Sequence, residues 1–314
     1  MNDSSAAEPI EISVVMPCLN EAGSVGICVE KALRALREMG ARGEVVIVDN
    51  GSTDGSPEVA EKAGARVVHE PRRGYGSAYL RGFSEARGKF FVMGDSDDSY
   101  DFLDIARFIA PLREGKDLVM GTRLKGTILP GAMSWSHRWI GNPILSGMLK
   151  LLFKTRISDS HCGMRAFTRE AWEKMALRTT GMEFASEMVV NSLRARLSMA
   201  EIPITYHPRI GESKLNGVRD AWRHVRFMLM FSPSYLFQLP GLLLFGIGLA
   251  LVAWLAGGPR ELFGRTWDYH PFLFGALALI LGTNLIAFDV IAKSFSMGAA
   301  DEIPKNPATA STLL

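Results

Sequence analysis

The stretch Lys89-Phe-Phe-Val-Met-Gly-Asp-Ser-Asp-Asp-Ser-Tyr100 decides the fold of this chain. Its apolar run 90–93 predicts a buried strand, because strands covered on both faces of a parallel sheet are continuously apolar. Ligands of such sheets bind beyond the carboxyl ends of the strands, where Asp95 and Asp97 follow. Two positions apart on an extended chain, the two carboxylates point to the same side. A hard divalent cation that also holds phosphate oxygens is the expected occupant, and a solvated acidic loop is the alternative.

The residues before this stretch alternate between expected strands and expected helices. Strands are predicted at 11–17, 44–48 and 65–69, and helices at 22–39, 57–63 and 74–86. This alternation is typical of βαβ units with right-handed crossovers. The chain is therefore expected to contain an α/β domain with a Rossmann-like, mostly parallel sheet.

Polar segments follow the predicted strands. They occupy 17–21, 49–56, 72–76 and 95–99. Since carboxyl ends of parallel strands share one edge of a sheet, these segments are expected to form a single cleft. Asp49 and Asp54 can accept hydrogen bonds from a nucleobase or ribose, whereas Arg72 or Arg73, with the helix start at Gly74, can bind phosphate. The cleft is therefore suited to a nucleoside diphosphate.

Composition and missing motifs exclude several functions. The formal net charge of +2 indicates no nucleic-acid partner. The sequence has neither the Gly-x-Gly-x-x-Gly nor the Gly-x-x-x-x-Gly-Lys-Ser/Thr motif, which disfavours dinucleotide oxidoreduction and P-loop ATP hydrolysis. Cys18, Cys28 and Cys162 lack metal-ligand spacing and are expected to be core thiols in a reducing compartment. The polar first ten residues predict no signal peptide.

Two stretches without charged side chains lie near the end of the chain. Asp, Glu, Lys and Arg are absent from 227–259 and again from 269–288. A membrane helix needs about 20 mostly apolar residues, so two spans are expected, with buried core helices as the alternative. Basic residues flank the pair, and the positive-inside rule puts the N-terminal domain and both termini in the cytoplasm. We therefore expect an integral protein of the inner or plasma membrane.

The expected organisation has six parts. We expect a disordered terminus at 1–10 and an α/β domain at 11–216. An interfacial amphipathic helix is predicted at 217–232, transmembrane helices at 235–258 and 270–292, and a cytoplasmic tail at 297–314. The segments 135–153 and 221–231 are basic and amphipathic, so each either lies in the bilayer interface or packs on the domain core. Asp289, near the end of the second span, is expected at the cytoplasmic interface.

The chain resembles family 2 glycosyltransferases of the GT-A fold in three motifs, Val14-Val-Met-Pro-Cys-Leu-Asn-Glu21, Val48-Asp-Asn-Gly-Ser-Thr-Asp54 and Asp95-Ser-Asp97. Downstream, it is similar to the polyprenyl-phosphate branch, which includes dolichyl-phosphate mannose and glucose synthases, in Gly121-Thr-Arg-Leu124, Asp159-Ser-His-Cys-Gly-Met-Arg165 and Gly211-Glu-Ser-Lys-Leu215. The resemblance implies inverting transfer of a sugar from a nucleotide sugar to undecaprenyl or dolichyl phosphate. It also implies Mg²⁺ or Mn²⁺ as cofactor.

The resemblance implies roles for individual residues. Nucleotide-sugar contacts are expected from Pro17, Asn20, Glu21, Asp49, Asp54, Arg73, Gly74 and Asp95, with Asp95 and Asp97 at the metal and diphosphate. Contacts to the acceptor phosphate are expected from Arg123, Arg138, Asn142 and Lys214. The expected catalytic residues are Asp97, Arg123, Arg138 and Asp159. Because a lipid phosphate is already a nucleophile, Asp159 either orients an arginine or the sugar, or acts as a base.

Several alternatives stay open at the level of sequence. Ser99 stands where dolichyl-phosphate mannose synthases have a Gln that can help hold metal. The stretches 95–100 and 181–187 look closer to the dolichyl-phosphate glucose synthases. This resemblance implies UDP-glucose as donor, with GDP-mannose and UDP-N-acetylglucosamine as alternatives. A processive polysaccharide synthase would need a Gln-x-x-Arg-Trp motif and more spans. A non-catalytic GT-A-like membrane subunit of a glycan-assembly complex is a further alternative, and a homo-oligomer is left open.

Overall fold

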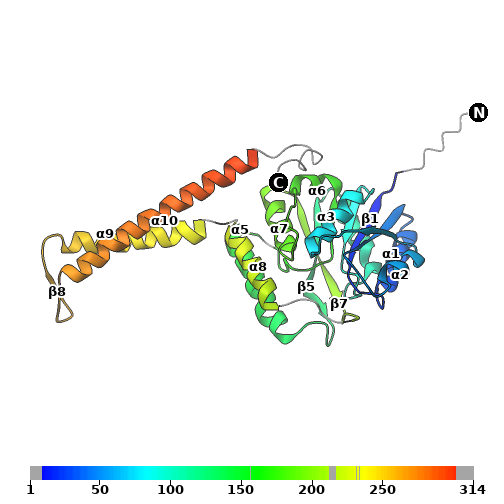
Figure 1. Cartoon of the computed structure of the whole chain (residues 1–314), viewed down its shortest axis with the longest axis horizontal. Coiled ribbons are helices and arrows are strands. Elements are labelled where there is room, and N and C mark those ends of the chain that lie inside the picture. The colour runs from blue at the N-terminus through cyan, green and yellow to red at the C-terminus, as the bar shows by residue number, and fades with distance from the viewer. Residues whose placement is uncertain (1–8, 156, 212–216, 231, 233, 302–314) are drawn as a thin grey trace, which may run out of the picture. The chain divides into compact units, whose positions relative to one another are not determined.

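The computed structural model describes residues 9–155, 157–211, 217–230, 232 and 234–301. It divides into two compact units, Met1–Met228 and Leu229–Leu314. The first unit is built on a β-sheet, and the second contains two long helices, α9 and α10, that pack against each other (Figure 1). Lys214 lies outside the described residues.

The first unit contains a seven-stranded sheet. Its strands are β1 (Ile12–Cys18), β2 (Gly43–Asp49), β3 (Arg66–His69), β4 (Phe90–Met93), β5 (Leu118–Ile128), β6 (Arg165–Thr168) and β7 (Met199–Tyr206). They lie in the order β3-β2-β1-β4-β6-β5-β7, and only β6 runs antiparallel to its neighbours. The prediction of a mostly parallel α/β sheet is confirmed.

Helices cover both faces of this sheet. On one face lie α1 (Val25–Glu38), α2 (Ser56–Lys62), the 3₁₀-helix η1 (Phe102–Asp104) and α4 (Ile105–Arg113). On the other lie α3 (Tyr75–Glu85), α6 (Arg169–Met175) and α7 (Phe184–Arg194). Further along the chain come the π-helical turn η2 (His137–Gly141), α5 (Asn142–Phe153) and α8 (Gly217–Met230).

The alternation of side chains along β1 separates the two hydrophobic layers. Val14 and Met16 belong to the core cluster beneath α1 and α4. Val15 points to the opposite face, where a Cβ added to Gly82 of α3 would lie 2.4 Å from its Cγ1. The apolar runs of β1 and β4 are therefore buried on both faces, as parallel strands require. All three cysteines are buried and unpaired, which confirms the predicted core thiols.

The second unit is a helical hairpin. It comprises the π-helical turn η3 (Ser234–Gln238), α9 (Leu239–Leu255), the short strands β8 (Arg260–Leu262) and β9 (Arg265–Trp267), and α10 (Tyr269–Asp301). Two segments, Ser234–Leu255 and Tyr269–Ser294, are long and apolar enough to cross a membrane. Glycines let the helices approach closely, since a Cβ at Gly248 would lie 2.6 Å from the Gly275 oxygen.

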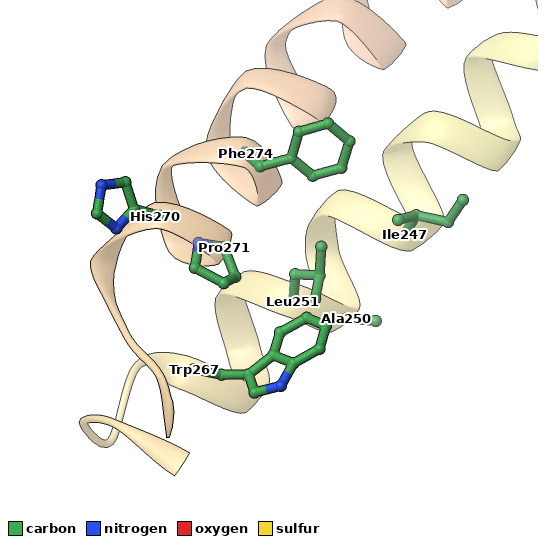
Figure 2. Close-up of a pocket in the computed structure, with 7 residues that line it drawn as sticks. All are labelled: Ile247, Ala250, Leu251, Trp267, His270, Pro271 and Phe274. Carbon is green, nitrogen blue, oxygen red and sulfur yellow. The ribbon is translucent and has the colours of Figure 1, made fainter. Parts of the chain in front are cut away.

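The two ends of the hairpin differ in polarity. Near the β8–β9 turn, an apolar hollow of about 700 Å³ is lined by Ile247, Ala250, Leu251, Trp267, His270, Pro271 and Phe274 (Figure 2). At the other end, Asp289 is 1 % exposed and lies 2.7 Å from the Lys293 ammonium. Lys293 also donates to Gln238 Oε1 at 3.3 Å. Asp289 is therefore buried, and its charge is matched within the hairpin.

Candidate active site

A cavity of about 320 Å³ lies at the carboxyl ends of β1, β2 and β4. It is lined by Pro17, Cys18, Leu19, Glu21, Asn50, Arg73, Gly74, Tyr75, Ala78, Asp95, Ser96, Asp97, Met182, Arg209 and Arg223. Polar segments from distant parts of the sequence therefore meet where the parallel strands end, as the strand-end argument predicts. Six residues proposed from sequence are among them, namely Pro17, Glu21, Arg73, Gly74, Asp95 and Asp97.

Asp95 and Asp97 form the acidic side of the cavity. The Tyr75 hydroxyl donates to Asp95 Oδ1 at 3.0 Å, and the Ser99 amide donates to Asp97 Oδ1 at 3.0 Å. Burial, and then the charge of Asp97, raise the pKa of Asp95 to about 7, while the Tyr75 bond opposes the rise. A cation between the two carboxylates would relieve this repulsion, so the pair fits a divalent metal ion that also binds phosphate.

Few of the described side chains beside Asp95 and Asp97 can ligate a metal ion. Within the described parts of the chain, no group of three or more His, Cys, Asp or Glu side chains is arranged to hold a metal ion. The Ser99 hydroxyl donates to Asp97 Oδ1, so it orients that carboxylate. Asp98, in a left-handed conformation at φ +59°, pairs with Lys31 at 2.7 Å, and Asp101 caps η1. The acids that follow the pair thus shape the loop.

Three residues expected to contact the nucleotide lie in the loop network beside the cavity and outside its lining. Asp54 accepts from the Ala22 amide at 3.0 Å, and Asn20 accepts from the Thr53 amide at 2.7 Å. Asp49 accepts from backbone amides two and three residues further along its own loop. These bonds tie the loop after β1 to the loop after β2 and so shape one wall of the cavity.

The glycine-rich start of α3 forms another wall. Asn50 accepts from the Gly74 amide at 2.8 Å and donates to the carbonyls of residues 70 and 72. Gly74 has φ +152°, and a Cβ there would lie 2.3 Å from the Thr180 carbonyl oxygen. Only glycine permits both this conformation and this close approach. The arrangement places Arg73 and Tyr75 in the cavity lining.

Arg123 and Asp159 form a buried ion pair. Arg123 Nε and Nη2 donate to the Asp159 carboxylate at 2.7 and 2.9 Å, and the Arg123 amide donates to it at 3.0 Å. Arg123 is 7 % exposed, Asp159 is fully buried, and the guanidinium lies over the Tyr206 ring at 5.2 Å. Burial would raise the pKa of Asp159, but the charge and hydrogen bonds of Arg123 outweigh it and lower that pKa. The two side chains therefore form a buried ion pair with two side-chain hydrogen bonds.

The reversed direction of β6 brings this pair to the ligand edge of the sheet. In β6, Arg165 pairs with Met93 at the end of β4 and with Met120 of β5. The segment that precedes β6, which contains Asp159, therefore lies at the same edge as the carboxyl ends of the parallel strands. Such a reversal is a property of the tertiary fold.

Two further residues proposed for the acceptor, Arg138 and Asn142, do not line the cavity. Arg138 is exposed on η2, with its guanidinium 5.3 Å from the Trp139 ring. The Asn142 amide lies 3.4 Å from the sulfur of Met133. Neither Arg123, Arg138 nor Asn142 lines the cavity.

The structure adds an arginine that sequence reasoning missed. Arg209 Nη2 donates to Glu21 Oε1 at 3.1 Å, and Nη1 lies 3.6 Å from Asp97 Oδ2. Its buried Nε has no hydrogen-bond partner among the described residues. An isolated arginine outside a motif carries no specific signal in the sequence. Met182 and Arg223 were likewise not predicted.

The sheet with its strand-end cavity of acidic and basic side chains defines a GT-A-type domain. The chain matches the family described as Glycosyl transferase family 2 over residues 13–175, about half of its length. It is 45 % identical over 295 residues to the low-salt glycan biosynthesis hexosyltransferase Agl6 of Haloferax volcanii, covering 92 % of this chain and 71 % of that protein. The chain therefore belongs to glycosyltransferase family 2, which confirms the resemblance seen in the sequence.

Two other similarities bear on function and fold. The dolichyl-phosphate beta-glucosyltransferase of Saccharomyces cerevisiae is 29 % identical over 264 residues, with 75 % of this chain and 78 % of that protein covered. Glucosyl-3-phosphoglycerate synthase of Mycobacterium tuberculosis, solved with Mn²⁺ and UDP-glucose, has a TM-score of 0.56 at 21 % identity, covering 71 % of this chain and 79 % of that one. This second likeness concerns the fold.

Proposed function

We propose that this glycosyltransferase moves a hexose, with UDP-glucose as the preferred donor, onto the phosphate of a polyprenyl lipid at the cytoplasmic face of a membrane. The observation that carries the proposal is the cavity with paired carboxylates and arginines, in a chain that also has two candidate membrane spans. The yeast relative that uses dolichyl phosphate and the hexosyltransferase of glycan biosynthesis support the same chemistry.

The donor end of the proposed reaction uses the acidic side of the cavity. Asp95 and Asp97, held by Tyr75 and Ser99, are the residues that would bind Mg²⁺ or Mn²⁺. When bound, the ion supplies Lewis-acid stabilisation to the departing diphosphate. A structural neighbour solved with Mn²⁺ and UDP-glucose supports the use of a divalent cation. Arg209, which bridges Glu21 and Asp97, adds positive charge beside the diphosphate.

The acceptor end of the proposed reaction uses Arg123. A lipid phosphate is ionised at neutral pH and needs position more than it needs a base. Asp159 fixes the Arg123 guanidinium with two side-chain hydrogen bonds, so the cation needs little reorganisation when it stabilises negative charge. The lowered pKa of Asp159 makes this carboxylate a poor proton acceptor. We therefore assign it the orienting role.

The topology follows from charge. Basic residues precede the first candidate span and follow the second, which favours a cytoplasmic catalytic unit with both termini on the same side. GDP-mannose and UDP-N-acetylglucosamine are the alternative donors. A non-catalytic role as a membrane subunit is the alternative function, and turnover by the purified protein separates the two.

The test is a transfer assay with the full-length protein in detergent. Labelled UDP-glucose, GDP-mannose or UDP-N-acetylglucosamine is incubated with undecaprenyl or dolichyl phosphate and Mg²⁺ or Mn²⁺. We expect labelled lipid with UDP-glucose, loss of label with a chelator, and recovery on adding the metal back. Absence of labelled lipid with all three donors, from protein that still binds a nucleoside diphosphate, would reject the proposal.

A further inference from the structure

Three residues of the cavity lining lie beyond the part of the chain that matches the family. They are Met182, Arg209 and Arg223, whereas the family match ends at residue 175. Arg223 stands apart, because it comes from α8, the amphipathic helix at the end of the first unit.

The position of α8 is set by a buried histidine. His224 is 6 % exposed, and its Nδ1 lies 2.8 Å from the hydroxyl of Ser186, a fully buried residue of α7. The His224 ring also packs edge-to-face on the ring of His161 at 4.5 Å. With Phe227 and Met228, also buried, His224 forms the i, i+3, i+4 pattern of a packed helix face.

Arg223 directly precedes His224 in α8 and is one of the residues that line the cavity. Its side chain is exposed and lines the same hollow as Arg73 and Arg209. The same lining also includes the carboxylates of Glu21, Asp95 and Asp97. Guanidinium groups recognise phosphate oxygens through paired hydrogen bonds, so a wall with three of them favours an anionic ligand.

We propose that Arg223 binds a phosphate group in this cavity and that His224 is the residue that positions it, through the contact of α8 with α7. The inference rests on the proposed function only for the two sources of that phosphate, the nucleoside diphosphate and the polyprenyl phosphate. In either case α8 completes the site, and the enzyme acts only when this helix is docked.

The test removes one positive charge from either of two positions on the same helix. Arg223→Gln is compared with Arg226→Gln, which changes an exposed arginine one turn away that does not line the cavity. UDP binding is measured by calorimetry with Mn²⁺, and polyprenyl-phosphate binding by thermal stabilisation of the full-length protein in detergent. Neither readout requires turnover, so a failure of the proposed transfer reaction would be recognised separately.

We expect Arg223→Gln to weaken one of the two ligands by about tenfold or more, the usual scale for a lost charged hydrogen bond. Arg226→Gln should stay within about twofold of wild type for both. A loss confined to UDP assigns Arg223 to the donor, and a loss confined to the lipid assigns it to the acceptor. Equal effects of the two variants on both ligands would overturn the proposal.

A double-mutant cycle tests the role of His224. His224→Phe keeps a planar aromatic ring and loses the hydrogen bond to Ser186, so it should weaken the same ligand as Arg223→Gln. If His224 acts through Arg223, the histidine change has no further effect on that affinity in the Arg223→Gln background. Additive losses would show that His224 only supports the fold, and would overturn its positioning role.

Discussion

Two carboxylate–arginine pairs at the same edge of the sheet use the same chemical groups in opposite ways. Arg123 and Asp159 meet through bonds of 2.7 and 2.9 Å and are almost inaccessible to solvent. Asp97 and Arg209 are 3.6 Å apart and line an open cavity. The first pair is satisfied by its own partners, and the second has hydrogen-bonding capacity left for a ligand.

The carboxyl pKa values of the two regions are shifted in opposite directions. Arg123 lowers the pKa of Asp159 despite burial, whereas burial and the neighbouring Asp97 raise the pKa of Asp95 to about 7. A lowered carboxyl pKa means that the ionised form stabilises the fold, and a raised one means that the ionised form costs stability. The Arg123–Asp159 ion pair, the closed pair, therefore stabilises the fold. In the cavity around Asp95, Asp97 and Arg209, the open region, the two carboxylates repel each other, and a bound cation would relieve that repulsion.

The largest expected effect is on the open region. Asp97→Asn should lower the transfer rate by about 1,000-fold or more, because removing the charge removes a carboxylate proposed to hold the metal ion. Its free energy of unfolding should stay within about 1 kcal/mol of wild type, since repulsion from Asp95 is lost too. Radiolabel transfer and thermal unfolding provide the two measurements.

The matched control is Asp98→Asn, one residue further on, where the carboxylate pairs with Lys31. We expect its transfer rate to fall less than about threefold, since a partly exposed ion pair contributes little. Near-normal turnover by Asp97→Asn would remove the metal assignment.

The next effect concerns the closed pair. Asp159→Asn should lower the free energy of unfolding by about 3–5 kcal/mol, because it leaves the Arg123 charge buried without its partner. Chemical denaturation of the detergent-solubilised protein measures this.

A double variant separates structure from function in that pair. Arg123→Met with Asp159→Leu should recover most of the lost stability, since apolar residues can replace a buried ion pair, but it should not recover lipid transfer. Full transfer by the stable double variant would contradict the acceptor role of Arg123.

A smaller effect concerns the close contact between the start of α3 and the segment around Thr179, which lies beside the cavity. A Cβ at Gly76 would lie 2.1 Å from the Thr179 carbonyl oxygen, so Gly76→Ala should destabilise the protein by about 1–3 kcal/mol and weaken UDP binding. Gly147→Ala is the control, because its Cβ meets nothing within 4 Å in α5 and alanine favours a helix by about 1 kcal/mol. Equal unfolding midpoints for the two variants would refute the close approach.

The smallest effect is a pH dependence. Burial, and then His224, lower the pKa of His161 well below its usual range. The unfolded state therefore binds a proton that the folded state excludes. This histidine by itself lowers stability by up to about 1.4 kcal/mol per unit as pH falls below about 6.5. The raised pKa of Asp95 acts in the opposite direction in the same pH range, so the contribution of His161 is the difference in slope between wild type and His161→Asn, measured by thermal unfolding between about pH 5 and 7.5. An unchanged slope in that variant would assign the effect to other groups.

Local patterns were enough to predict the first half of the sheet and its acidic edge. The apolar run before Gly94 predicted β4, and the polar residues that follow predicted the side of the sheet on which a ligand binds. Asp95 and Asp97 were found for the same reason, since a strand and the residues directly after it are read from one short stretch. The charge-free segments near the end of the chain likewise predicted two apolar helices.

Contacts between distant residues were decided by the tertiary structure alone. The bond between Arg209 and Glu21 joins positions 188 residues apart, and no motif marks Arg209. The reversal of β6 brings Asp159 beside Arg123, and the docking of α8 on Ser186 brings Arg223 to the cavity. The sequence by itself determined which strands are buried and where they end, because periodicity and burial are local. The packing of the whole fold decides which charged side chains are buried against each other and which line the cavity.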